Sequence, residues 1–414
     1  MVAPLEGVRV LEIANWAAAP SAGAIMADLG ADVVKVEAPQ GDSMRGALRQ
    51  PHQADPGAPT IDYVFGAINR GKRSIAVALD HPEGPALVRR LAGGVDIVVT
   101  NLTRARQQRY GLTPDELRDA NPRLVVACLS GYGPDGPDAD RQGFDMTSFF
   151  ARGGVMSLLG EPDEPPVRFR PGQGDQTTSL NLLAAVLCAL RVRDQTGEGQ
   201  TVHVSLLQTA LWTLTVDLSA ALVDRRQPPR RTRADSPSPL TTTYRTADDR
   251  WLILSAPFPR QWPAFCHAVG RPEWAEDERY ATPMDRYVHR ETLIPLIEER
   301  FASATLAEWA TRLDEHGVTW GPVATLPEVV DDPQVRALGA FAEIDDPVVG
   351  PHETVATPFR IDGADVAPGG PAPVAGAHTA EVLADAGFGP DELEELRTRG
   401  IVAIGDETAG RPPA

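Results

Sequence analysis

The sequence predicts an α/β fold with a large parallel-sheet domain and a smaller α+β domain. Through the first 130 residues, short apolar segments typical of strands alternate with segments typical of helices, which is the pattern of a sheet covered by helices. The predicted strands carry apolar residues on both faces, as buried parallel strands do. The chain has 414 residues, which is long enough for more than one domain.

The elements of the large, Rossmann-like domain follow one another closely. Strands are predicted at 8–13, 32–37, 74–79, 95–99 and 124–129, and helices at 22–29, 82–91 and 114–120. The first strand–helix turn, 14–21, lacks the Gly-x-Gly-x-x-Gly pattern, so a nicotinamide-dependent enzyme is disfavoured despite the alternation. Ligands on such sheets bind at the carboxyl ends of the strands, where we expect the site.

Composition divides the chain into segments 1–224, 225–330 and 331–414. Residues 224–239 are rich in proline and arginine, which is typical of a solvated linker. The smaller domain that follows has a predicted strand at 251–254 and helices at 262–269, 291–302 and 305–315. Residues 350–376 are predicted to form a loop, and the last segment, with helices at 379–386 and 390–398, to return to the large domain.

The charge balance limits the possible partners. The net charge is −18, whereas nucleic acids and anionic membranes both require a basic surface. Neither is expected as a partner, although a local arginine cluster could still bind phosphates. We find no membrane-spanning run, no signal-peptide pattern and no cysteine or histidine spacing that suits zinc. A cytoplasmic enzyme without a metal is expected.

One carboxylate stands where it could act on a ligand. Asp175 lies in the glycine-rich segment 171–178, directly before a long apolar helix. The dipole at a helix start favours the ionised carboxylate, and an ionised carboxylate close to a substrate is a potential nucleophile. The alternative role is structural, because Asp is a preferred residue for capping a helix. The residues alone leave both roles open.

Motifs along the whole chain carry a family resemblance. They occupy residues 4–12, 29–37, 69–74, 131–134, 174–175, 196–200 and 378–383. Together and in this order they resemble the family III CoA-transferases, the group of formyl-CoA and carnitine CoA-transferases that also contains α-methylacyl-CoA racemases. Members of this family form interlocked homodimers, so the resemblance implies a homodimer here.

The resemblance also implies a mechanism. Asp175 matches the aspartate of the family's Gly-Asp motif, which is the nucleophile, and it could cap the helix as well. It would attack an acyl-CoA thioester, pass through a mixed anhydride and an aspartyl-CoA thioester, and transfer coenzyme A to a free carboxylic acid. Covalent catalysis of this kind conserves the thioester energy, so no permanently bound cofactor is needed.

Coenzyme A contacts are implied at four places. By resemblance they are Trp16, Ala17, Ala18, Lys72, Arg73, Asn101, Leu102 and Arg109. Lys72 and Arg73 could instead be solvated surface charges. Ala38 stands where the family often has arginine, so Arg45 is a candidate replacement.

Position 144 separates the two branches of the family. Racemases carry a Gly-His-Asp motif there, whereas this chain has Gly143, Phe144 and Asp145. Phe144 cannot transfer a proton, so the transferase branch is favoured. Two alternatives stay open: a racemase, isomerase or lyase that uses Asp175 as an acid–base group, and a non-catalytic protein that binds coenzyme A. Asp145 is expected to form hydrogen bonds at the start of a helix over 146–150.

Four side chains are candidates for the substrate site. Arg152 lies in the segment 151–154, which resembles the same segment of family members that act on 2-hydroxy, aromatic or dicarboxylic acids. It could pair with a substrate carboxylate or bind backbone carbonyls. The glycine-rich lid of formyl-CoA transferases is absent from the smaller domain. Phe149, Phe150 and Tyr244 are therefore candidates for excluding water, although aromatic side chains could equally be core residues.

Overall fold

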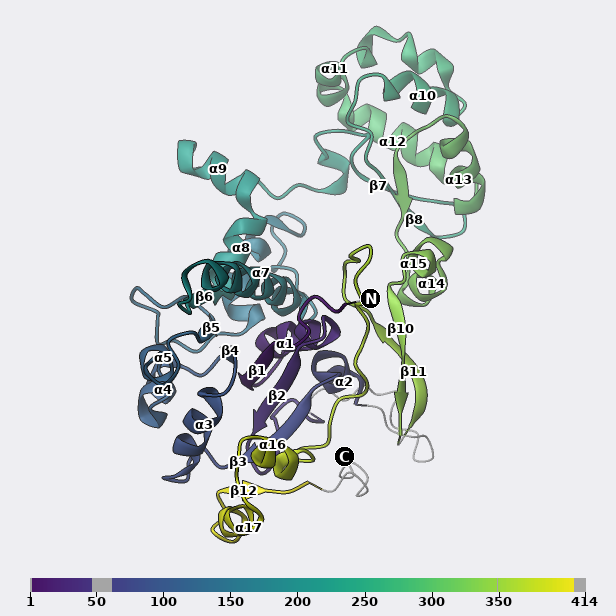
Figure 1. The fold of residues 1–414 in the computed structure, drawn as a ribbon. Coiled ribbons are helices and arrows are strands. Elements are labelled where there is room, and N and C mark those ends of the chain that lie inside the picture. Colours follow the sequence, from purple (N-terminus) through teal and green to yellow (C-terminus); the bar gives the residue numbers. More distant parts are fainter. Residues whose placement is uncertain (1, 47–61, 348, 406–414) are drawn as a thin grey trace. The chain divides into compact units, whose positions relative to one another are not determined.

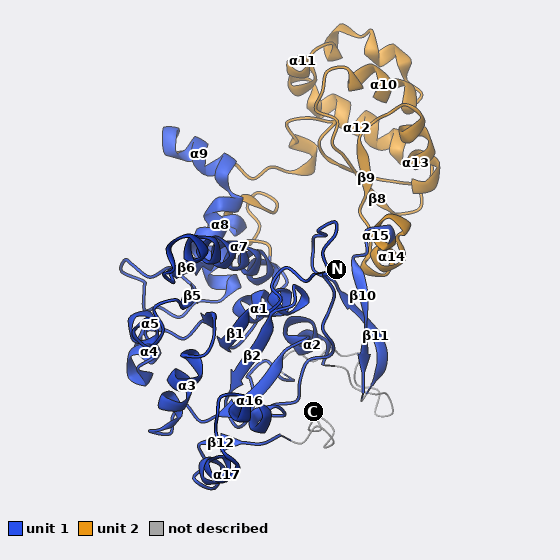
Figure 2. Cartoon of the chain, viewed as in Figure 1, with its two compact units in different colours: residues 1–156, 168–225, 337–414 blue, residues 157–167, 226–336 orange. Residues whose placement is uncertain are grey.

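The computed structural model describes residues 2–46, 62–347 and 349–405. The chain forms two compact units (Figure 2). Unit 1 takes residues 1–156, 168–225 and 337–414, and unit 2 takes residues 157–167 and 226–336. The short segment 157–167 therefore leaves the first unit and returns to it, which the composition of the sequence does not indicate.

Unit 1 is built on a seven-stranded sheet (Figure 1). The strand order is β12-β3-β2-β1-β4-β5-β6, and all neighbours are parallel except β12 and β3. The strands are β1 (Arg9–Ile13), β2 (Asp32–Glu37), β3 (Arg73–Val77), β4 (Ile97–Thr100), β5 (Val125–Ser130), β6 (Thr201–Ser205) and β12 (Val402–Ala403). The predicted α/β class, with a Rossmann-like parallel sheet, is confirmed.

Helices cover both faces of this sheet. The helices of unit 1 are α1 (Ala18–Asp28), α2 (Tyr63–Asn69), α3 (Gly84–Ala92), α4 (Arg104–Tyr110), α5 (Pro114–Ala120), α7 (Gln173–Thr196), α8 (Leu206–Thr213), α9 (Thr215–Asp224), α16 (Thr379–Asp385), α17 (Pro390–Thr398) and the π-helix η2 (Asp145–Arg152), and α6 (Val155–Leu158) begins in unit 1 and ends in unit 2. Helices α1 and α7 pack on one face, and α3, α5 and α16 on the other. Successive strand residues alternate between the two cores, as Val10 and Leu11 do in β1.

This arrangement creates a switch point at the carboxyl ends of β1 and β4. The two strands are neighbours in the sheet, but α1 after β1 and α5 after β4 lie on opposite faces. Open α/β sheets bind their ligands in the crevice at such a point. The crevice here is bordered by the turn after β1 and by the residues that follow Thr100.

Several elements differ from their predictions. Helix α1 begins at Ala18 rather than residue 22, because proline is tolerated in the first turn, where Pro20 lies. Residues predicted as part of a loop form strand β11 (Gly350–Val355), which pairs with β10 (Phe341–Asp346). A hairpin partner thus overrides the local proline and glycine signals. Residues 226–239 of the predicted linker belong to unit 2. There Asp235 accepts hydrogen bonds from Arg231 and Arg290.

Unit 2 has its own core. Its antiparallel strands are β7 (Thr243–Arg245), β8 (Trp251–Leu254) and β9 (Trp320–Pro322). Its helices are α10 (Gln261–Ala268), α11 (Pro283–Val288), α12 (Arg290–Phe301), α13 (Leu306–Glu315) and α14 (Leu326–Asp331), with α15 (Pro333–Ala337) at its end and the 3-10 turns η3 (Arg233–Asp235), η4 (Pro272–Ala275) and η5 (Glu278–Tyr280). The core is unusually aromatic and contains Trp262, Phe265, Phe301 and Trp309.

One part of unit 1 is strongly apolar yet exposed. Among the described residues, no single helix is long and apolar enough to cross a membrane. The consecutive helices α8 and α9, bent by 82°, meet that criterion together by length and composition only. The apolar side chains that they expose are Leu211, Trp212, Val216, Leu222 and Val223.

Candidate active site

A cavity of about 1450 Å³ lies in unit 1 at the switch point. It is lined by residues 15–18 after β1, 101–104 after β4, the end of β5, the start of η2 and the start of α7. Its volume exceeds the roughly 300–1000 Å³ of sites for drug-sized ligands. The cavity therefore has room for a long substrate.

Asp175 lines this cavity near the start of α7. The helix begins at Gln173, and its N-cap is Gly172, whose φ of +103° suits glycine. Asp175 is thus the third residue of the helix, and no side chain caps the helix. The expectation that Asp175 caps α7 is wrong, because the helix starts two residues earlier than a cap at this position requires. Its carboxylate is left for another role.

The ionisation of Asp175 also differs from the expectation. Burial raises the pKa of its carboxyl group to about 7, and the nearby carboxylate of Asp145 adds to this rise. The helix dipole alone would favour the charged form. Removal from water raises the pKa of the carboxyl group by more than the helix dipole lowers it, because burial takes solvation away from the charged form. Near neutral pH, Asp175 therefore exists in both protonation states.

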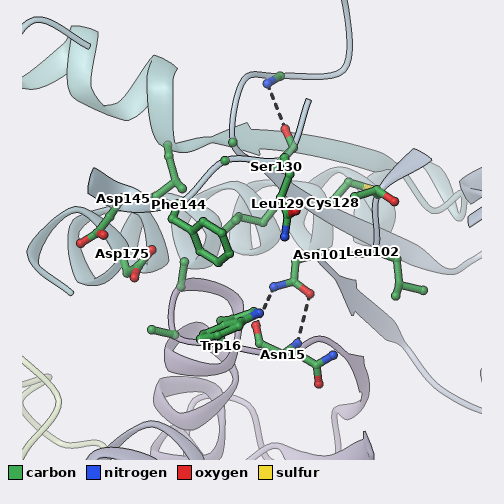
Figure 3. A pocket seen from close by; sticks show the side chains of 18 of the residues that line it. Asn15, Trp16, Asn101, Leu102, Cys128, Leu129, Ser130, Phe144, Asp145 and Asp175 are labelled. Carbon is green, nitrogen blue, oxygen red and sulfur yellow. Dashed lines mark hydrogen bonds between the residues drawn. The ribbon is translucent and has the colours of Figure 1, made fainter. Parts of the chain in front are cut away.

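Asp145 holds the turn that carries Asp175. It is the buried first residue of η2, and its Oδ2 accepts a hydrogen bond of 2.6 Å from the N–H of Gly172. Figure 3 shows the two carboxyl groups side by side at one end of the cavity. Gly174 lets this turn pack closely, because a Cβ atom there would lie 2.8 Å from Cγ of Phe149. Asp145 thus binds the loop that precedes α7 rather than the start of its own helix, η2.

The first strand–helix turn forms another wall of the cavity. Asn101 holds it by accepting a hydrogen bond of 3.1 Å from the N–H of Asn15 and donating one of 2.6 Å to the carbonyl of Asn15. Trp16 has a φ of +66°, which is uncommon for a bulky residue. Its ring meets Phe144 edge to face, with 5.3 Å between the ring centroids. Ala17, Ala18 and Leu102 also line the cavity.

Lys72 lies beneath this turn rather than in the cavity. Its side chain is fully buried and donates to Glu12 at 2.7 Å and to the carbonyl of Pro20 at 2.8 Å. Burial lowers the pKa of its ammonium group to about 8. Lys35 is equally buried and pairs with Glu12 at 3.0 Å and Asp42 at 2.8 Å. The structure therefore gives Lys72 a place in a buried ionic network, and it is not a solvated surface charge.

Three further arginines from the sequence analysis are bound elsewhere. Arg73 pairs with three carboxylates, including Asp32 at 2.6 Å. Arg45 forms two hydrogen bonds with Glu37, of 2.6 and 2.8 Å. Arg109 pairs with Asp80 at 3.0 Å on the surface. None of these three arginines lines the cavity.

The sequence analysis did not identify the arginines that do line the cavity. They are Arg104, Arg106, Arg141 and Arg170. Arg104 and Arg106 lie on α4, which was not predicted because its sequence has little apolar periodicity. The density of arginine in 104–109 was the signal that could have revealed them.

The four candidate substrate residues lie outside the cavity lining. Phe149 and Phe150 belong to η2 and are buried in a cluster with Leu206 and Ala210. Arg152 pairs with Asp138 at 3.0 Å. Tyr244 belongs to the core of unit 2, where its hydroxyl donates to the carbonyl of Pro239. The aromatic rings that do line the cavity are Trp16, Tyr63 and Phe144.

The fold and site define an α/β protein of the doubly wound class, with a carboxyl group of raised pKa in a large cavity at the switch point. The chain belongs to CoA-transferase family III, whose model matches residues 5–379. Within the described ranges, no group of three or more His, Cys, Asp or Glu side chains could hold a metal ion.

Named relatives of this chain are CoA-transferases. It is 31% identical over 402 residues to the (R)-2-hydroxy-4-methylpentanoate CoA-transferase of Clostridioides difficile, covering 96% of this chain and 99% of that one. It is 34% identical over 387 residues to the succinate–glutarate CoA-transferase of Agrobacterium fabrum, covering 92% and 95%. The expected family and enzyme class are confirmed.

Solved structures agree with this assignment. A CAIB/BAIF family protein from Brucella suis superposes with a TM-score of 0.81 at 33% identity, covering 93% of this chain and all of that one. Rv3272 from Mycobacterium tuberculosis gives a TM-score of 0.80 at 31% identity, covering 92% and 99%.

Proposed function

We propose that this protein transfers coenzyme A from an acyl-CoA to a free carboxylic acid through a covalent intermediate on Asp175. The observation that carries the proposal is the position of Asp175 in the cavity, in the first turn of α7, which is preceded by Gly172. The N–H of Gly172 donates a hydrogen bond to the carboxylate of Asp145. Transfer between acyl-CoA and carboxylate is the activity of the named relatives, among them the succinate–glutarate enzyme. The covalent step is our inference from the site.

The reaction balances without an external acid or base. The Asp175 carboxylate attacks the thioester carbonyl, the C–S bond breaks, and coenzyme A leaves as a thiolate with a mixed anhydride left on the enzyme. The thiolate then attacks the aspartyl carbonyl and releases the donor acid as a carboxylate. The incoming carboxylate repeats both steps in reverse. Each oxyanion can accept hydrogen bonds from backbone N–H groups, which the first turn of α7 leaves without partners inside the helix.

We propose that the end of the cavity near Asn101 binds coenzyme A. Trp16, Ala17, Ala18, Asn101 and Leu102 form this part of the lining. Arg104 and Arg106 supply the positive charge for phosphates, in place of the buried Lys72 and of Arg73. Arg109 lies one turn beyond Arg106 on α4 and can join them if it leaves Asp80.

Replacing Arg106 by alanine should weaken acyl-CoA binding. A charge-assisted hydrogen bond contributes about 1.5–3 kcal/mol, so we expect KM for acyl-CoA to rise about tenfold or more with kcat nearly unchanged. Steady-state kinetics at fixed acceptor concentration measure both values. Arg245→Ala, which removes an exposed ion pair with Asp249 in unit 2, is the matched control. An unchanged KM in Arg106→Ala would remove this residue from the coenzyme A site.

The rate should depend on pH through Asp175. Because only the carboxylate form attacks, and because its pKa is raised to about 7, kcat/KM should rise with pH and level off above about 7. Asp145→Asn removes the neighbouring negative charge, so the midpoint should move to lower pH. A pH profile of both proteins tests this. A midpoint that stays in place would show that Asp145 does not raise the pKa.

Trapping separates transfer from the alternatives. The raised pKa of Asp175 also suits an acid–base group, as in a racemase or isomerase. After incubation with acyl-CoA, hydroxylamine should convert Asp175 to a hydroxamate if a covalent intermediate forms. Exchange of the substrate α-proton without a hydroxamate would instead favour acid–base chemistry. Binding of coenzyme A with neither signal would indicate a non-catalytic binding protein.

We also propose that the chain forms a cytoplasmic homodimer. The three cysteines of the chain are unpaired, which supports a reducing compartment.

The proposed homodimer rests on an exposed apolar surface. Val216 and Val223 on α9 are 83% and 87% exposed, and an apolar surface of this kind favours a partner. Replacing both by aspartate should yield a monomer in analytical ultracentrifugation, whereas Val288→Asp on α11 should not. A wild-type monomer would contradict the proposal.

A further inference from the structure

One cation of the cavity lining has no partner among the described residues. Arg170 lies on the segment 168–172, which precedes α7, and it lines the same cavity as Asp175. Its side chain is exposed, and none of the hydrogen bonds and ion pairs within the described ranges includes it. A guanidinium group stays charged in a protein and has only donors. Arg170 is therefore available to an anionic group of a ligand.

The other arginines of the cavity lining are paired or lie elsewhere. Arg141 forms an ion pair of 3.7 Å with Asp138. Arg104 and Arg106 lie on α4, at the end of the cavity that we propose for coenzyme A. Arg170 instead belongs to the segment that leads directly into α7, the helix of the proposed nucleophile. It is thus the cation that can serve the part of the substrate that reacts.

The backbone around Arg170 is fixed to η2, the helix that begins with Asp145. Phe169 stacks on Phe150 of η2, with 4.3 Å between the ring centroids and 12° between the ring planes. Two residues after Arg170, the N–H of Gly172 donates a hydrogen bond of 2.6 Å to Oδ2 of Asp145. These two contacts flank Arg170. They hold its backbone close to the acidic end of the cavity, while its unpaired side chain can turn toward a ligand.

The charge at this end of the cavity makes such a cation necessary for some substrates. The carboxyl groups of Asp145 and Asp175 lie side by side there (Figure 3). A substrate with a second carboxylate would bring a further negative charge toward them, which costs free energy unless a cation pairs with it. Arg170 can supply this pairing, because a planar guanidinium group binds a carboxylate through two parallel hydrogen bonds.

We infer that Arg170 is a specificity-determining residue that binds the second, non-reacting carboxylate of the acceptor, and that dicarboxylic acids are the preferred acceptors. One carboxylate of the acid attacks the aspartyl-CoA carbonyl, the C–S bond breaks, and the negative charge passes to the thiolate of coenzyme A. The other carboxylate forms no covalent bond and stays paired with Arg170. This inference rests on the proposed transfer through Asp175.

The test compares succinate with butanoate, in which a methyl group replaces the second carboxylate. At about pH 8 both carboxylates of succinate are ionised. We expect the wild-type kcat/KM to be at least about tenfold higher for succinate, as one charge-assisted hydrogen bond implies. In Arg170→Met this ratio should fall toward one, with butanoate used as well as by the wild type. Arg170→Lys should retain part of the ratio, because it keeps the charge but not the two parallel hydrogen bonds.

Arg168→Met is the matched control. Arg168 is exposed in the same segment, and its loss changes the net charge equally, but it does not line the cavity, so this variant should keep the wild-type ratio. A wild-type ratio of about one or less would overturn the inference, as would an unchanged ratio in Arg170→Met. An equal fall in Arg168→Met would also overturn it, because the effect would then be general electrostatic attraction. Failure of the proposed function looks different: the wild-type protein would then transfer coenzyme A to neither acid and would give no hydroxamate at Asp175.

Discussion

Asp175→Asn is expected to abolish coenzyme A transfer, with a loss in kcat of about 10⁴-fold or more, as for other covalent nucleophiles. The amide has nearly the shape of the carboxylate but cannot form the anhydride. The end of the cavity near Asn101 is left intact, so the dissociation constant for coenzyme A should change little. Turnover assays together with isothermal titration measure both quantities.

The same variant has a second, independent signature. The folded-state pKa of Asp175, about 7, lies above the ordinary aspartate value of 3.8. Between these values the folded state binds more protons than the unfolded state, so this group lowers stability as pH rises from about 4 to 7. Asp175→Asn should therefore raise the free energy of unfolding at pH 8, by on the order of 4 kcal/mol at most, and should change it little at pH 4. Residual transfer activity, or a loss of stability at pH 8, would refute the assignment.

Lys35→Met should destabilise unit 1 by about 3–5 kcal/mol, as expected when one partner of a buried ion pair is removed. Lys35 is completely buried between Glu12 and Asp42, and methionine leaves their carboxylates without one of the two ammonium groups of the network. It also removes the hydrogen bond to the carbonyl of Ala14. Urea denaturation measures the change in the free energy of unfolding.

Arg109→Met provides the matched control for that measurement. Arg109 and Asp80 form an ion pair in the same unit, but the two side chains are 66% and 75% exposed. Exposed pairs contribute about 0–1 kcal/mol, so this variant should unfold nearly as the wild type does. Equal losses for Lys35→Met and Arg109→Met would contradict the structural role of the buried network.

Local sequence signals were sufficient for many elements. Strand β2 and helices α5 and α17 have the predicted bounds, because an apolar run or a start signal within a few residues defines each of them. Helix α4 lacks apolar periodicity, and strand β11 depends on its pairing with β10. Neither property can be detected within a short window.

In the site, too, the features that depend on residues far apart in the sequence could not be predicted. Asp175 was identified from its motif, but its raised pKa depends on burial in the folded chain and, to a lesser extent, on Asp145, thirty residues earlier. Lys72 was expected to contact coenzyme A, with a solvated surface charge as the alternative, and its buried pairing with Glu12, sixty residues away, was not evident from the sequence. The contact between Trp16 and Phe144 joins residues that lie 128 positions apart in the sequence. Such pairs exist only after the chain has folded.

The burial of Asp175 has a consequence for which enzyme form accumulates during turnover. In the free enzyme the ionised side chain bears the cost of leaving water and of facing Asp145. In the proposed mechanism, acylation of Asp175, or its conversion to the aspartyl-CoA thioester, turns this group into a neutral one and removes that cost. The covalent forms are thereby favoured over the resting carboxylate, so a substantial share of the protein should carry the intermediate at steady state.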